Sequence, residues 1–464
     1  MYKKINEKDL EYLRKITSQD RVFSKDEIES DYTHDELGTV KAIPEVHVKV
    51  INKEEVIEIM KYAHKEVIPV TVRGAGTGLV GACVPVSGGI LLDLSKMTQF
   101  IELDKENLTL TVEPGVLLLD IYEYVEKEGL FYAPDPGEKT ATIGGNIACN
   151  AGGMRAVKYG VTRDWVRGLE VVLANGDLIH LGGKVVKNST GYDLKDLIIG
   201  SEGTLAIVVS ATLKLIPKPK RLTSLLVPFE TLEQAIEVAP KLMVDHVIPT
   251  GLEIFEKTSI KSSEEFLGKK IPNGNYEAYL LLSYDGSNDQ ALEEDIEIAS
   301  KLCVEKYGAI DAFLVDTEER KGNIWTVRGG FLEAIKASTT EMDECDVVLP
   351  RSNILEFLNY TKEVSKNLKM RIPYFGHIGD GNLHIYLCKD DIEQKKYDEL
   401  KQKGFDLLYK KAYELGGLVS GEHGIGYAKR EYLEKMTEKP HLELMKSIKK
   451  VFDPKGILNP NKVV

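Results

Sequence analysis

Three of the nine histidines in this chain fall within two short motifs bounded by glycine. Residues 376–384 read G-H-I-G-D-G-N-L-H, and residues 420–426 read S-G-E-H-G-I-G. Imidazole and carboxylate groups together suit zinc, iron or manganese. A turn within the first motif could bring His384 back towards His377, and Glu422 could supply a third ligand. The alternative is a pair of hydrogen-bonded loop histidines and a surface Glu-His pair, and the spacing alone leaves both open.

A second candidate site is the glycine-rich stretch 74–81, which reads G-A-G-T-G-L-V-G and contains a G-x-G-x-x-G pattern. A Rossmann site needs this loop to open a helix and an acidic residue about 20 positions further on. Pro85 and two more glycines follow instead, and no suitable acidic residue is present, so the sequence excludes a Rossmann NAD site. What remains is either a loop whose backbone N–H groups face an anion, or a tight turn between strands.

Further glycine clusters favour a cofactor over a simple turn. Residues 134–137 read P-D-P-G and predict a turn, and residues 140–153 consist mostly of small residues. A flat ring system or a long dinucleotide could lie along such a backbone. Residues 200–203 read G-S-E-G and lead into a β-rich run that ends before Pro217.

The elements that must position these residues can be predicted for the first half of the chain. Alternating residues over 45–50 predict a strand, Asn52 an N-cap with a capping box to Glu55, and 69–73 a second strand, which makes a β-α-β unit. An Asn-Gly turn within 169–181 predicts a hairpin. Pro217 and Pro219, flanked by lysines, mark the clearest domain boundary.

The second half alternates helices and strands and predicts an α+β domain with an antiparallel sheet. Strands are expected over 225–229, 277–283, 310–315 and 347–349, with helices beginning at Leu232, Asp289 and Ile354 and one passing through Trp325. Two helical stretches are expected after Gly426. The first 35 or so residues are charged and helical, and no chemistry can be assigned to them.

Length and composition limit the classes of protein that fit. The chain has 464 residues, whereas single cores stop growing at about 250–300, so two or more domains are expected. Its net charge of −13 does not suit a general nucleic-acid binder. Five scattered cysteines without a C-x-x-C exclude a disulfide scaffold and a self-contained iron–sulfur cluster. With no hydrophobic leader or long apolar run, we expect a cytoplasmic protein without a membrane span.

Four motifs together carry a family resemblance. The strings R-G-A-G-T-G from Arg73, P-D-P-G from Pro134, I-G-G-N-I-A-C-N-A-G-G from Ile143 and G-S-E-G-T-L from Gly200 occur in this order. They resemble the FAD-binding domain of the vanillyl-alcohol oxidase / p-cresol methylhydroxylase superfamily. The resemblance is strongest to the branch that contains the D-type glycolate oxidase chains and the D-lactate dehydrogenases.

This resemblance implies the fold class and the domain boundaries. The class is α+β, with an FAD-binding domain of two subdomains, a ferredoxin-like α+β cap domain and a C-terminal helical segment. The implied boundaries are an N-terminal helical segment over 1–38, the FAD-binding domain over 39–219, the substrate or cap domain over 220–415, and a segment over 416–464 that returns to the FAD domain.

The resemblance also implies which residues border the FAD. They lie in the four motifs and are Arg73, Gly74, Ala75, Gly76, Thr77, Gly78, Pro134, Gly137, Thr142, Gly144, Gly145, Asn150, Gly153, Glu202, Gly203 and Ile207. Relatives that tether FAD often use a histidine of this domain. His180 lies in the predicted hairpin and His64 in a predicted helix, so we expect non-covalent FAD.

The two histidine motifs resemble those of metal-containing D-2-hydroxyacid dehydrogenases of the same superfamily. Carried over by residue, His377, His384 and Glu422 become the ligands of one divalent iron, zinc or manganese ion, and His423 the general base. Arg328 matches the family's W-x-x-R and offers a bidentate cation for a substrate carboxylate. The substrate-binding set implied by the resemblance is Trp325, Arg328, Leu332 and Asn382.

One departure from the family pattern bears on the substrate. Relatives that oxidise 2-hydroxyglutarate place a threonine and a lysine where this chain has Leu332 and, after one inserted residue, Glu344. An apolar group and a negative charge would not favour a second carboxylate. We therefore expect a short D-2-hydroxy acid, D-lactate ahead of glycolate.

The function expected from the sequence is FAD- and metal-dependent oxidation of D-lactate to pyruvate, with hydride transfer to flavin N5. Electrons would then pass to a partner, either electron-transfer flavoprotein, as in a lactate dehydrogenase–electron-transfer flavoprotein complex, or an iron–sulfur subunit. The alternatives are a glycolate dehydrogenase subunit with an iron–sulfur partner and a non-catalytic flavin electron-carrier subunit. The intact set of histidines, Glu422 and Arg328 favours catalysis.

Overall fold

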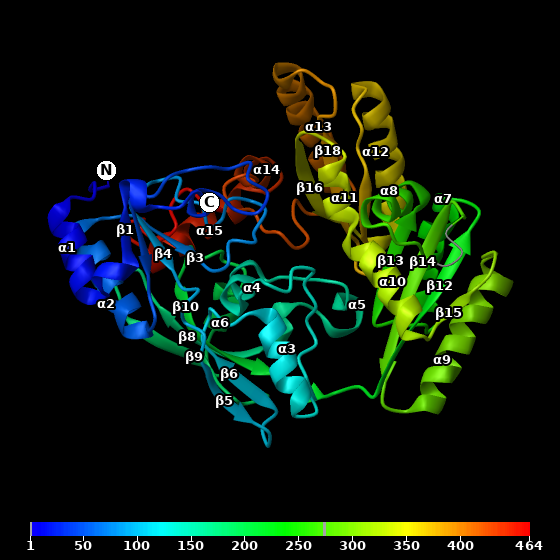
Figure 1. The fold of residues 1–464 in the computed structure, drawn as a ribbon, viewed down its shortest axis with the longest axis horizontal. Helices are drawn as coiled ribbons and strands as arrows, with labels where there is room; N and C mark the ends of the chain where they lie inside the picture. The colour runs from blue at the N-terminus through cyan, green and yellow to red at the C-terminus, as the bar shows by residue number, and fades with distance from the viewer. Residues whose placement is uncertain (1, 272–274) are drawn as a thin grey trace. The chain divides into compact units, whose positions relative to one another are not determined.

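The computed structural model describes residues 2–271 and 275–464 and divides into two compact units (Figure 1). Unit 1 contains the chain up to Gly152, Val161–Lys218 and Glu422–Val464. Unit 2 contains Gly153–Gly160 and Pro219–Gly421. The chain therefore leaves unit 1 after Lys218, at the proline pair, and re-enters it at Glu422.

Unit 1 begins with a four-stranded sheet in the order β1-β2-β4-β3, formed by β1 (Val22–Ser24), β2 (Val46–Lys49), β4 (Ile90–Asp93) and β3 (Val70–Arg73). Strands β2 and β3 both run parallel to β4, and α2 (Lys53–Glu66) connects them, as the β-α-β pattern predicts. Asn52 caps α2 by accepting from the Glu55 N–H at 2.9 Å. The Glu55 side chain departs from a capping box, because it accepts from the Ile51 N–H and binds Arg21 instead.

The N-terminal segment is part of this unit and is not wholly helical. Helix α1 (Glu7–Ile16) is closed by a capping box between Asn6 and Asp9, and the Tyr12 ring stacks on Tyr62 of α2 at 4.1 Å. Strand β1 pairs antiparallel with β2 and so extends the sheet by one strand. The short β-pairing was missed because only three residues of β1 take part in it.

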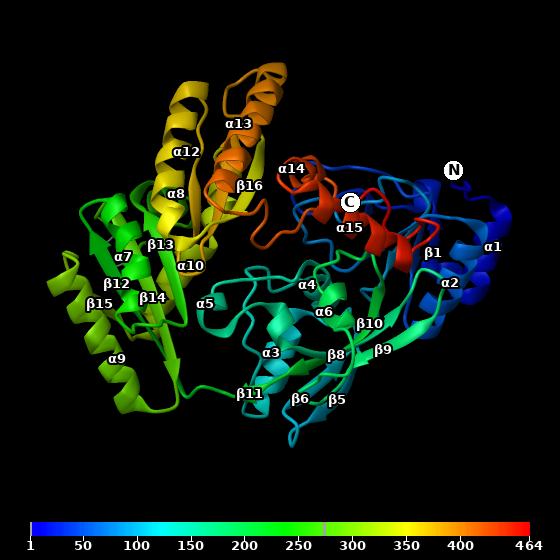
Figure 2. The same cartoon turned by 180° about the vertical axis from the view of Figure 1, so that it is seen from behind.

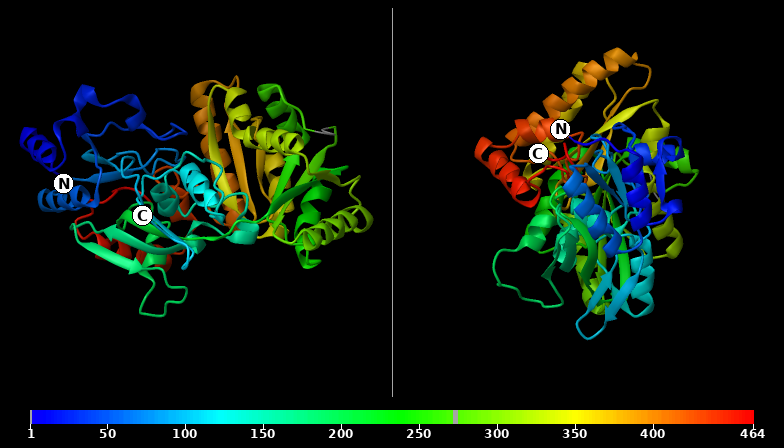
Figure 3. Two further views of the ribbon diagram at one scale, coloured as in Figure 1. Left: turned by 60° about the horizontal axis from the view of Figure 1, so that its bottom comes forward. Right: turned by 90° about the vertical axis from the view of Figure 1, so that its left-hand side faces the viewer.

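The second sheet of unit 1 has five strands in the order β5-β6-β10-β8-β9. Its strands are β5 (Phe100–Asp104), β6 (Thr109–Val112), β10 (Ile207–Lys214), β8 (Val166–Val172) and β9 (Leu178–Gly182). The predicted hairpin is β8–β9, with Leu169 opposite Leu181. Beyond β9 a loop projects away from the sheet (Figure 3), with Tyr192 almost fully exposed, and it ends at α6 (Leu194–Ile198).

Short elements and the C-terminal helices complete unit 1. They are α3 (Leu118–Lys127), β7 (Leu130–Phe131), which pairs with β11 (Ile216–Pro217), α4 (Ile143–Cys149), α14 (Arg430–Lys435) and α15 (Lys439–Phe452). One buried apolar core joins α1, α2, both sheets and the tail residues Ile457 and Leu458. Burial of these apolar side chains provides the hydrophobic stabilisation that holds the C-terminal tail on unit 1.

Unit 2 is built on one antiparallel sheet of seven strands in the order β15-β12-β14-β13-β17-β18-β16 (Figure 2). Its strands are β12 (Arg221–Phe229), β13 (Gly251–Glu256), β14 (Ala278–Gly286), β15 (Phe313–Val315), β16 (Met342–Val348), β17 (Tyr374–His377) and β18 (Asn382–Cys388). The antiparallel α+β prediction is confirmed. Strands β13, β17 and β18 were not predicted, because charged or histidine residues interrupt their apolar pattern.

The helices of unit 2 cover the sheet. They are α5 (Ala156–Tyr159), α7 (Leu232–Val244), α8 (Lys257–Leu267), α9 (Asp289–Lys301), α10 (Glu318–Gly329), α11 (Phe331–Ala337), α12 (Ile354–Leu368) and α13 (Gln394–Glu414). A buried cluster from α8, α10 and α11 packs on the sheet face that carries Phe255, Phe375 and Tyr386. No helix in the described part of the chain is long and apolar enough to cross a bilayer.

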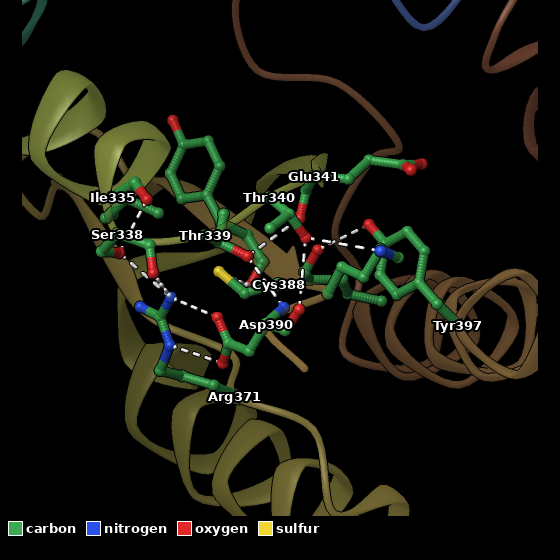
Figure 4. Close-up of polar contacts among 12 residues, drawn as sticks. Ile335, Ser338, Thr339, Thr340, Glu341, Arg371, Cys388, Asp390 and Tyr397 are labelled. Atoms are coloured by element: carbon green, nitrogen blue, oxygen red, sulfur yellow. Dashed lines mark hydrogen bonds and ion pairs between the residues drawn. The ribbon is translucent and has the colours of Figure 1, made fainter. Parts of the chain in front are cut away.

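The far end of β18 is tied down by a polar network (Figure 4). The Arg371 guanidinium donates to both carboxylate oxygens of Asp390, at 2.9 and 2.7 Å, and to Ser338. The Asp390 N–H donates to Thr339 Oγ1 at 2.9 Å, and the Tyr397 hydroxyl donates to the Leu387 carbonyl. These bonds fix the strand at the end opposite to His384.

Candidate active site

In unit 1 the two main glycine clusters lie against each other. A Cβ placed on Gly74 would lie 2.2 Å from Thr142 Oγ1, the N-cap of α4. A Cβ on Gly144 would lie 2.6 Å from Pro114. Residues 74–89, all described, contain no helix, so the Rossmann interpretation is excluded by the structure as well. The glycines are needed because two backbone segments approach too closely for side chains.

The outer side of this arrangement is open. Ala75 and Gly78 are exposed, and a Cβ on Gly78 or Gly137 would meet no atom within 4 Å. The backbone at Pro134 is held by Tyr122, whose hydroxyl donates to the Pro134 carbonyl at 2.5 Å. A cradle that is tight on the protein side and open on the other suits an extended dinucleotide laid along the backbone.

Arg73 supports this loop from within the protein. Its guanidinium donates to the carbonyls of His34 and Asp31, both at 2.8 Å, and lies against the position that a Cβ on Gly76 would take. The side chain is buried, and these bonds commit it to the N-terminal segment. The structure therefore shows Arg73 in contact with the N-terminal segment. Its expected contact with the cofactor stays a prediction.

Asp35 is a residue of this region that the sequence did not reveal. Its buried carboxylate accepts from the Gly81 N–H at 2.6 Å and from the Gly38 N–H at 3.2 Å. The Glu36 N–H donates to the Gly78 carbonyl at 3.1 Å. Burial raises the pKa of Asp35, against the backbone hydrogen bonds that lower it. The segment before the first predicted strand thus fastens both ends of the glycine loop.

The third motif docks on the C-terminal end of α4. The Gly200 N–H donates to the Ile147 carbonyl at 3.0 Å and the Glu202 N–H to the Ala148 carbonyl at 2.7 Å. Asn150 ends α4 in a left-handed conformation and accepts from the Arg163 N–H. Gly203 follows with a φ of +68°, and Ile207 opens β10 with its side chain buried. The motifs of 142–150 and 200–207 are therefore neighbours, whereas Gly153 belongs to unit 2.

The Glu202 carboxylate faces the second histidine motif. It accepts from the N–H groups of Ile425 and Gly426, each at 2.7 Å, and a Cβ on Gly424 would lie 2.8 Å from it. Burial raises the pKa of Glu202 to about 7, against the lowering effect of the two N–H groups and of the lysines nearby. The Glu202 carboxylate thus holds the turn that follows Glu422 and His423, and its expected place beside the flavin stays a prediction.

The C-terminal tail is fixed in unit 1 by a buried ammonium group. Lys462 donates to the carbonyls of Ala82 and Val84, at 3.0 and 2.7 Å, and to Asn459. Asn459 in turn donates to the Glu202 carbonyl at 2.7 Å. Burial lowers the pKa of Lys462 to about 8.

In unit 2 the first histidine motif forms a hairpin. His377 ends β17, Asn382 begins β18 opposite it, and the imidazole centroids of His377 and His384 lie 5.6 Å apart and nearly perpendicular. Both rings are buried. The expected turn therefore does bring the two imidazoles together.

Glu253 links His377 to Arg328. One oxygen of Glu253 lies 2.5 Å from His377 Nδ1, and the other accepts from Arg328 Nε and Nη2 at 2.8 and 2.7 Å. Burial alone would raise the pKa of Glu253, but the charges of His377 and Arg328 and their hydrogen bonds outweigh it and hold the pKa at about 2. A carboxylate only accepts, so Nδ1 of His377 carries a proton, and Nε2 is the ring nitrogen left for another partner.

Glu344 does the same for His384. Its Oε1 lies 3.1 Å from His384 Nδ1 and 3.1 Å from the Tyr386 hydroxyl. Burial raises the pKa of Tyr386 well above its usual value, and the charge on Glu344 adds to the effect. The family-pattern argument placed Glu344 near a distal substrate group, and the structure shows that it contacts a predicted metal ligand.

Asp346 connects the two histidine motifs. It lies opposite His384 across the β16–β18 pairing, and its carboxylate accepts from Asn382 Nδ2 at 2.7 Å. It also accepts from the Ser420 hydroxyl at 2.7 Å and the Gly421 N–H at 3.1 Å. The Asn382 amide oxygen is buried and has no hydrogen-bond partner among the described residues. It is therefore an acceptor that a ligand hydroxyl can satisfy.

The remaining predicted substrate residues lie on the helices above this face. Trp325 and Arg328 belong to α10, and Leu332 to α11. Trp325 and Leu332 are half-buried and pack against the apolar cluster of unit 2. The Arg328 guanidinium lies 4.8 Å from the Phe375 ring centroid and 5.6 Å from that of Phe331. Glu422 and His423 follow Gly421 directly and are grouped with unit 1.

Chemically, unit 2 presents two imidazoles, each with Nδ1 on a buried carboxylate, and one guanidinium near the same sheet face. Imidazole held by a buried carboxylate is the usual arrangement around a protein-bound transition metal. A guanidinium next to it suits a small carboxylate ligand. Unit 1 supplies a glycine-lined cradle. These are the parts of a cofactor-dependent oxidoreductase.

Comparison with known proteins identifies the class. A family model described as an FAD binding domain matches residues 44–182, and one described as FAD linked oxidases, C-terminal domain, matches residues 218–463. The chain belongs to the FAD-linked oxidases.

Individual relatives agree. The chain is 47% identical to D-lactate dehydrogenase of Anaerostipes hadrus, with 100% of this chain and 98% of the relative covered. It is 39% identical to glycolate oxidase subunit GlcD of Bacillus subtilis (strain 168), covering 93% of this chain and 91% of the relative. The solved structure of p-cresol methylhydroxylase with substrate bound has the same fold, with a TM-score of 0.82 at 18% identity over 100% of this chain and 98% of that one.

The predicted superfamily, its fold and the FAD-dependent oxidoreductase class are thereby confirmed. The buried carboxylates Asp35, Glu253 and Asp346 were missed, and Glu344 was named only as a position near a second substrate carboxylate. Glu253 was the most visible of them in the sequence, since it interrupts an apolar run at residues 251–255. A charge at such a position needs a buried partner.

Proposed function

We propose that this chain oxidises a short D-2-hydroxy acid, D-lactate first, to the corresponding 2-oxo acid. The observation that carries the proposal is the pair His377 and His384, each with Nδ1 on a buried carboxylate, beside Arg328 on the same sheet face. The D-lactate dehydrogenase relative supports the substrate. The glycine-lined cradle of unit 1 would hold FAD without a covalent link, and the bound flavin would supply the acceptor for the hydride that leaves C2 of the hydroxy acid.

Arg328 binds the substrate carboxylate in this proposal. Its Nε and Nη2 are committed to Glu253, which leaves Nη1 for the substrate. The rings of Phe331 and Phe375 lie close to the guanidinium group and help to hold its plane. The Asn382 amide oxygen, which lacks a partner among the described residues, accepts from the substrate hydroxyl or from a water molecule bound there.

His377, His384 and Glu422 are the proposed ligands of one divalent iron, zinc or manganese ion. Each histidine offers Nε2, because Nδ1 is used by Glu253 or Glu344. Gly421 is held by Asp346, which lies opposite His384, and Glu422 is the next residue, with its Cα about 3.8 Å further along the chain. When bound, the ion acts as a Lewis acid that lowers the pKa of the substrate hydroxyl.

His423 is the proposed general base. It takes the hydroxyl proton as the C2–H bond breaks, which an imidazole titrating near neutrality can do. Glu202 supports this role by holding the N–H groups of Ile425 and Gly426, two and three residues further on.

The chain's own residues favour a monocarboxylate. Leu332 provides an apolar surface on α11, and Glu344 adds a negative charge beside His384 rather than a cation that could bind a second carboxylate. We therefore propose that D-2-hydroxyglutarate is a poor substrate.

We propose that the electrons would pass from the bound FAD to electron-transfer flavoprotein, and that this takes place in the cytoplasm. A second candidate is a glycolate dehydrogenase subunit that works with an iron–sulfur subunit. The 39% identical glycolate oxidase relative supports it.

Steady-state oxidation with an artificial electron acceptor tests the proposal. Purified FAD-loaded protein, supplied with Zn²⁺, Mn²⁺ or Fe²⁺ in turn, is given D-lactate, L-lactate, glycolate and D-2-hydroxyglutarate. We expect the highest kcat/KM with D-lactate. Glycolate as the best substrate would support the second candidate, equal rates with D-lactate and D-2-hydroxyglutarate would remove the specificity argument, and no turnover of any of them would favour an electron-carrier subunit.

A further inference from the structure

Glu253 is a fully buried charged group on the sheet face of unit 2 that carries the candidate site. Its relative exposure is 0%, and both of its oxygens are used, one by His377 and the other by Arg328. Taking a carboxylate out of water is costly unless hydrogen bonds and opposite charge compensate for it. Both compensating groups here are residues to which the proposed function gives separate tasks.

The position of Glu253 follows from the sheet register. Ile254 of β13 lies opposite Gly376 of β17, so in an antiparallel pair the next residues, Glu253 and His377, also lie side by side. Alternation along β13 directs Glu253 to the same face as Phe255, which packs on Phe331 of α11 at 5.4 Å. Arg328 lies at the end of α10, just before Phe331, and reaches Glu253 from above.

We propose that Glu253 is a positioning residue that fixes with one carboxylate both the metal-binding histidine and the substrate-binding arginine. This inference rests on the proposed function and extends it to a residue that touches neither substrate nor ion. The Glu253 Oε1 atom holds the His377 proton on Nδ1, which sets the ring orientation and leaves Nε2 as the ligand atom. The Glu253 Oε2 atom accepts from Nε and Nη2 of Arg328, which fixes the guanidinium plane and leaves Nη1 for the substrate.

A single carboxylate in this position makes two binding properties depend on one residue. An amide in its place has no charge, so neither His377 nor Arg328 keeps a charge-assisted hydrogen bond, and one of the two faces a like donor. Loss of the carboxylate that holds a metal-bound histidine weakens metal binding by about 10–100-fold. An Arg328 that Glu253 no longer fixes binds a carboxylate less well, because its side chain must be ordered when the substrate binds.

The test uses the full-length, FAD-loaded protein with Glu253→Gln as the variant and Glu256→Gln as its matched control. Glu256 ends the same strand three residues later and points to the opposite face. Two quantities are measured: the Co²⁺ dissociation constant by competition with a chelator, with the visible Co²⁺ spectrum as a signature of the ligand geometry, and the KM for D-lactate.

We expect Glu253→Gln to raise the Co²⁺ dissociation constant by about 10–100-fold, to alter the Co²⁺ spectrum and to raise the KM for D-lactate by about tenfold. The control should leave all three unchanged. A folded Glu253→Gln protein with wild-type values overturns the proposal, and so does one in which only one of the two binding constants moves.

Glu253→Asp keeps the test valid if the glutamine variant does not fold. The shorter carboxylate can reach one partner at a time, so both constants should rise, by less than in the glutamine variant. Wild-type constants in the folded aspartate variant overturn the proposal. If the wild-type protein binds Co²⁺ but oxidises no D-lactate, the proposed function fails on its own, and the Co²⁺ affinity of the variants still decides the His377 half of the inference.

Discussion

At the scale of single residues, the site depends on buried carboxylates that set the state of their neighbours. Glu253 and Glu344 each face Nδ1 of a histidine, and Asp346 accepts from both histidine motifs. None of the three is a predicted ligand or base. Glu253 and Glu344 determine which imidazole nitrogen is available, and the proposed metal binding depends on this property.

His423→Asn tests the proposed base. Loss of a general base lowers kcat by about 10²–10⁴-fold, while FAD content and Co²⁺ affinity should stay near those of the wild-type protein, because His423 is not among the proposed ligands. The measurements are kcat with an artificial acceptor, flavin absorbance and the chelator competition. His441→Asn, an exposed histidine on α15, is the control. An unchanged kcat would show that another group takes the proton.

Sequence reasoning found the histidines, Glu422 and Arg328 but not their partners. Motif spacing and family resemblance single out residues of the site itself. The supporting carboxylates Glu253, Glu344 and Asp346 come from β13 and β16, at least 30 residues before the motif of residues 376–384. Only the pairing of β13 with β17 and of β16 with β18 brings them together.

At the scale of elements, loops that carry the chemistry are held by side chains from other segments. The segment containing Asp35 holds the 74–81 loop, and the turn containing Glu202 holds the 424–426 turn. The glycine motifs could be predicted as a cofactor cradle. The clamping segments could not, because the N-terminal segment has no motif and Glu202 was taken as a cofactor contact.

Asp35→Asn should weaken FAD binding. One of the two N–H groups now held by the carboxylate, from Gly81 or Gly38, would face an amide NH₂. Loss of a hydrogen bond to a charged group costs about 1.5–3 kcal/mol, which corresponds to about 10–100-fold in the FAD dissociation constant measured by fluorescence titration. Asp31→Asn, in the same segment with an exposed side chain, is the control. Equal FAD affinity in both variants would contradict a clamping role.

Glu202→Gln should separate a contact with the turn from a contact with the cofactor. If the carboxylate holds the turn that carries Glu422 and His423, kcat falls by about tenfold or more, and amide exchange of a peptide covering 424–428 becomes faster, while FAD content is kept. Glu113→Gln, a buried glutamate of unit 1 that accepts from the Gln99 N–H, is the control. Loss of FAD with unchanged amide exchange would instead support the sequence-based assignment.

Over the whole molecule, the chain passes between its two units four times and ends in unit 1, where it began. Its last residues pack in the core of unit 1, where Leu458 forms an isolated parallel bridge with Val70 of β3. The proline-marked crossing after Lys218 and the antiparallel sheet of unit 2 could be predicted from sequence. The short excursion Gly153–Gly160 could not, since Lys158 and Tyr159 are held there by Asp285, about 126 residues away.

Lys462 gives the anchored tail a pH signature. Burial lowers the pKa of Lys462 from 10.5 to about 8, so between these values the unfolded chain binds more protons than the folded one. The penalty for burying the charged form is therefore complete below about pH 8 and fades as the pH rises. The unfolding free energy of the wild type, relative to Lys462→Met, should increase between about pH 8 and 9.5 in urea titrations. A difference that stays constant over this range would show that the folded-state pKa of Lys462 is not lowered.

We propose that the cradle of unit 1 holds FAD and that the histidine pair of unit 2 holds a metal ion. The metal ion would be needed for hydride transfer to the FAD. Anaerobic stopped-flow mixing of the FAD-loaded protein with D-lactate, before and after removal of metal by a chelator and after its return, measures this directly. We expect rapid loss of flavin absorbance in the metal-loaded protein. The rate of flavin reduction should fall by several orders of magnitude after chelation and recover when the metal is added back. Flavin reduction at the same rate in the metal-free protein, or no reduction by D-lactate at all, would contradict it.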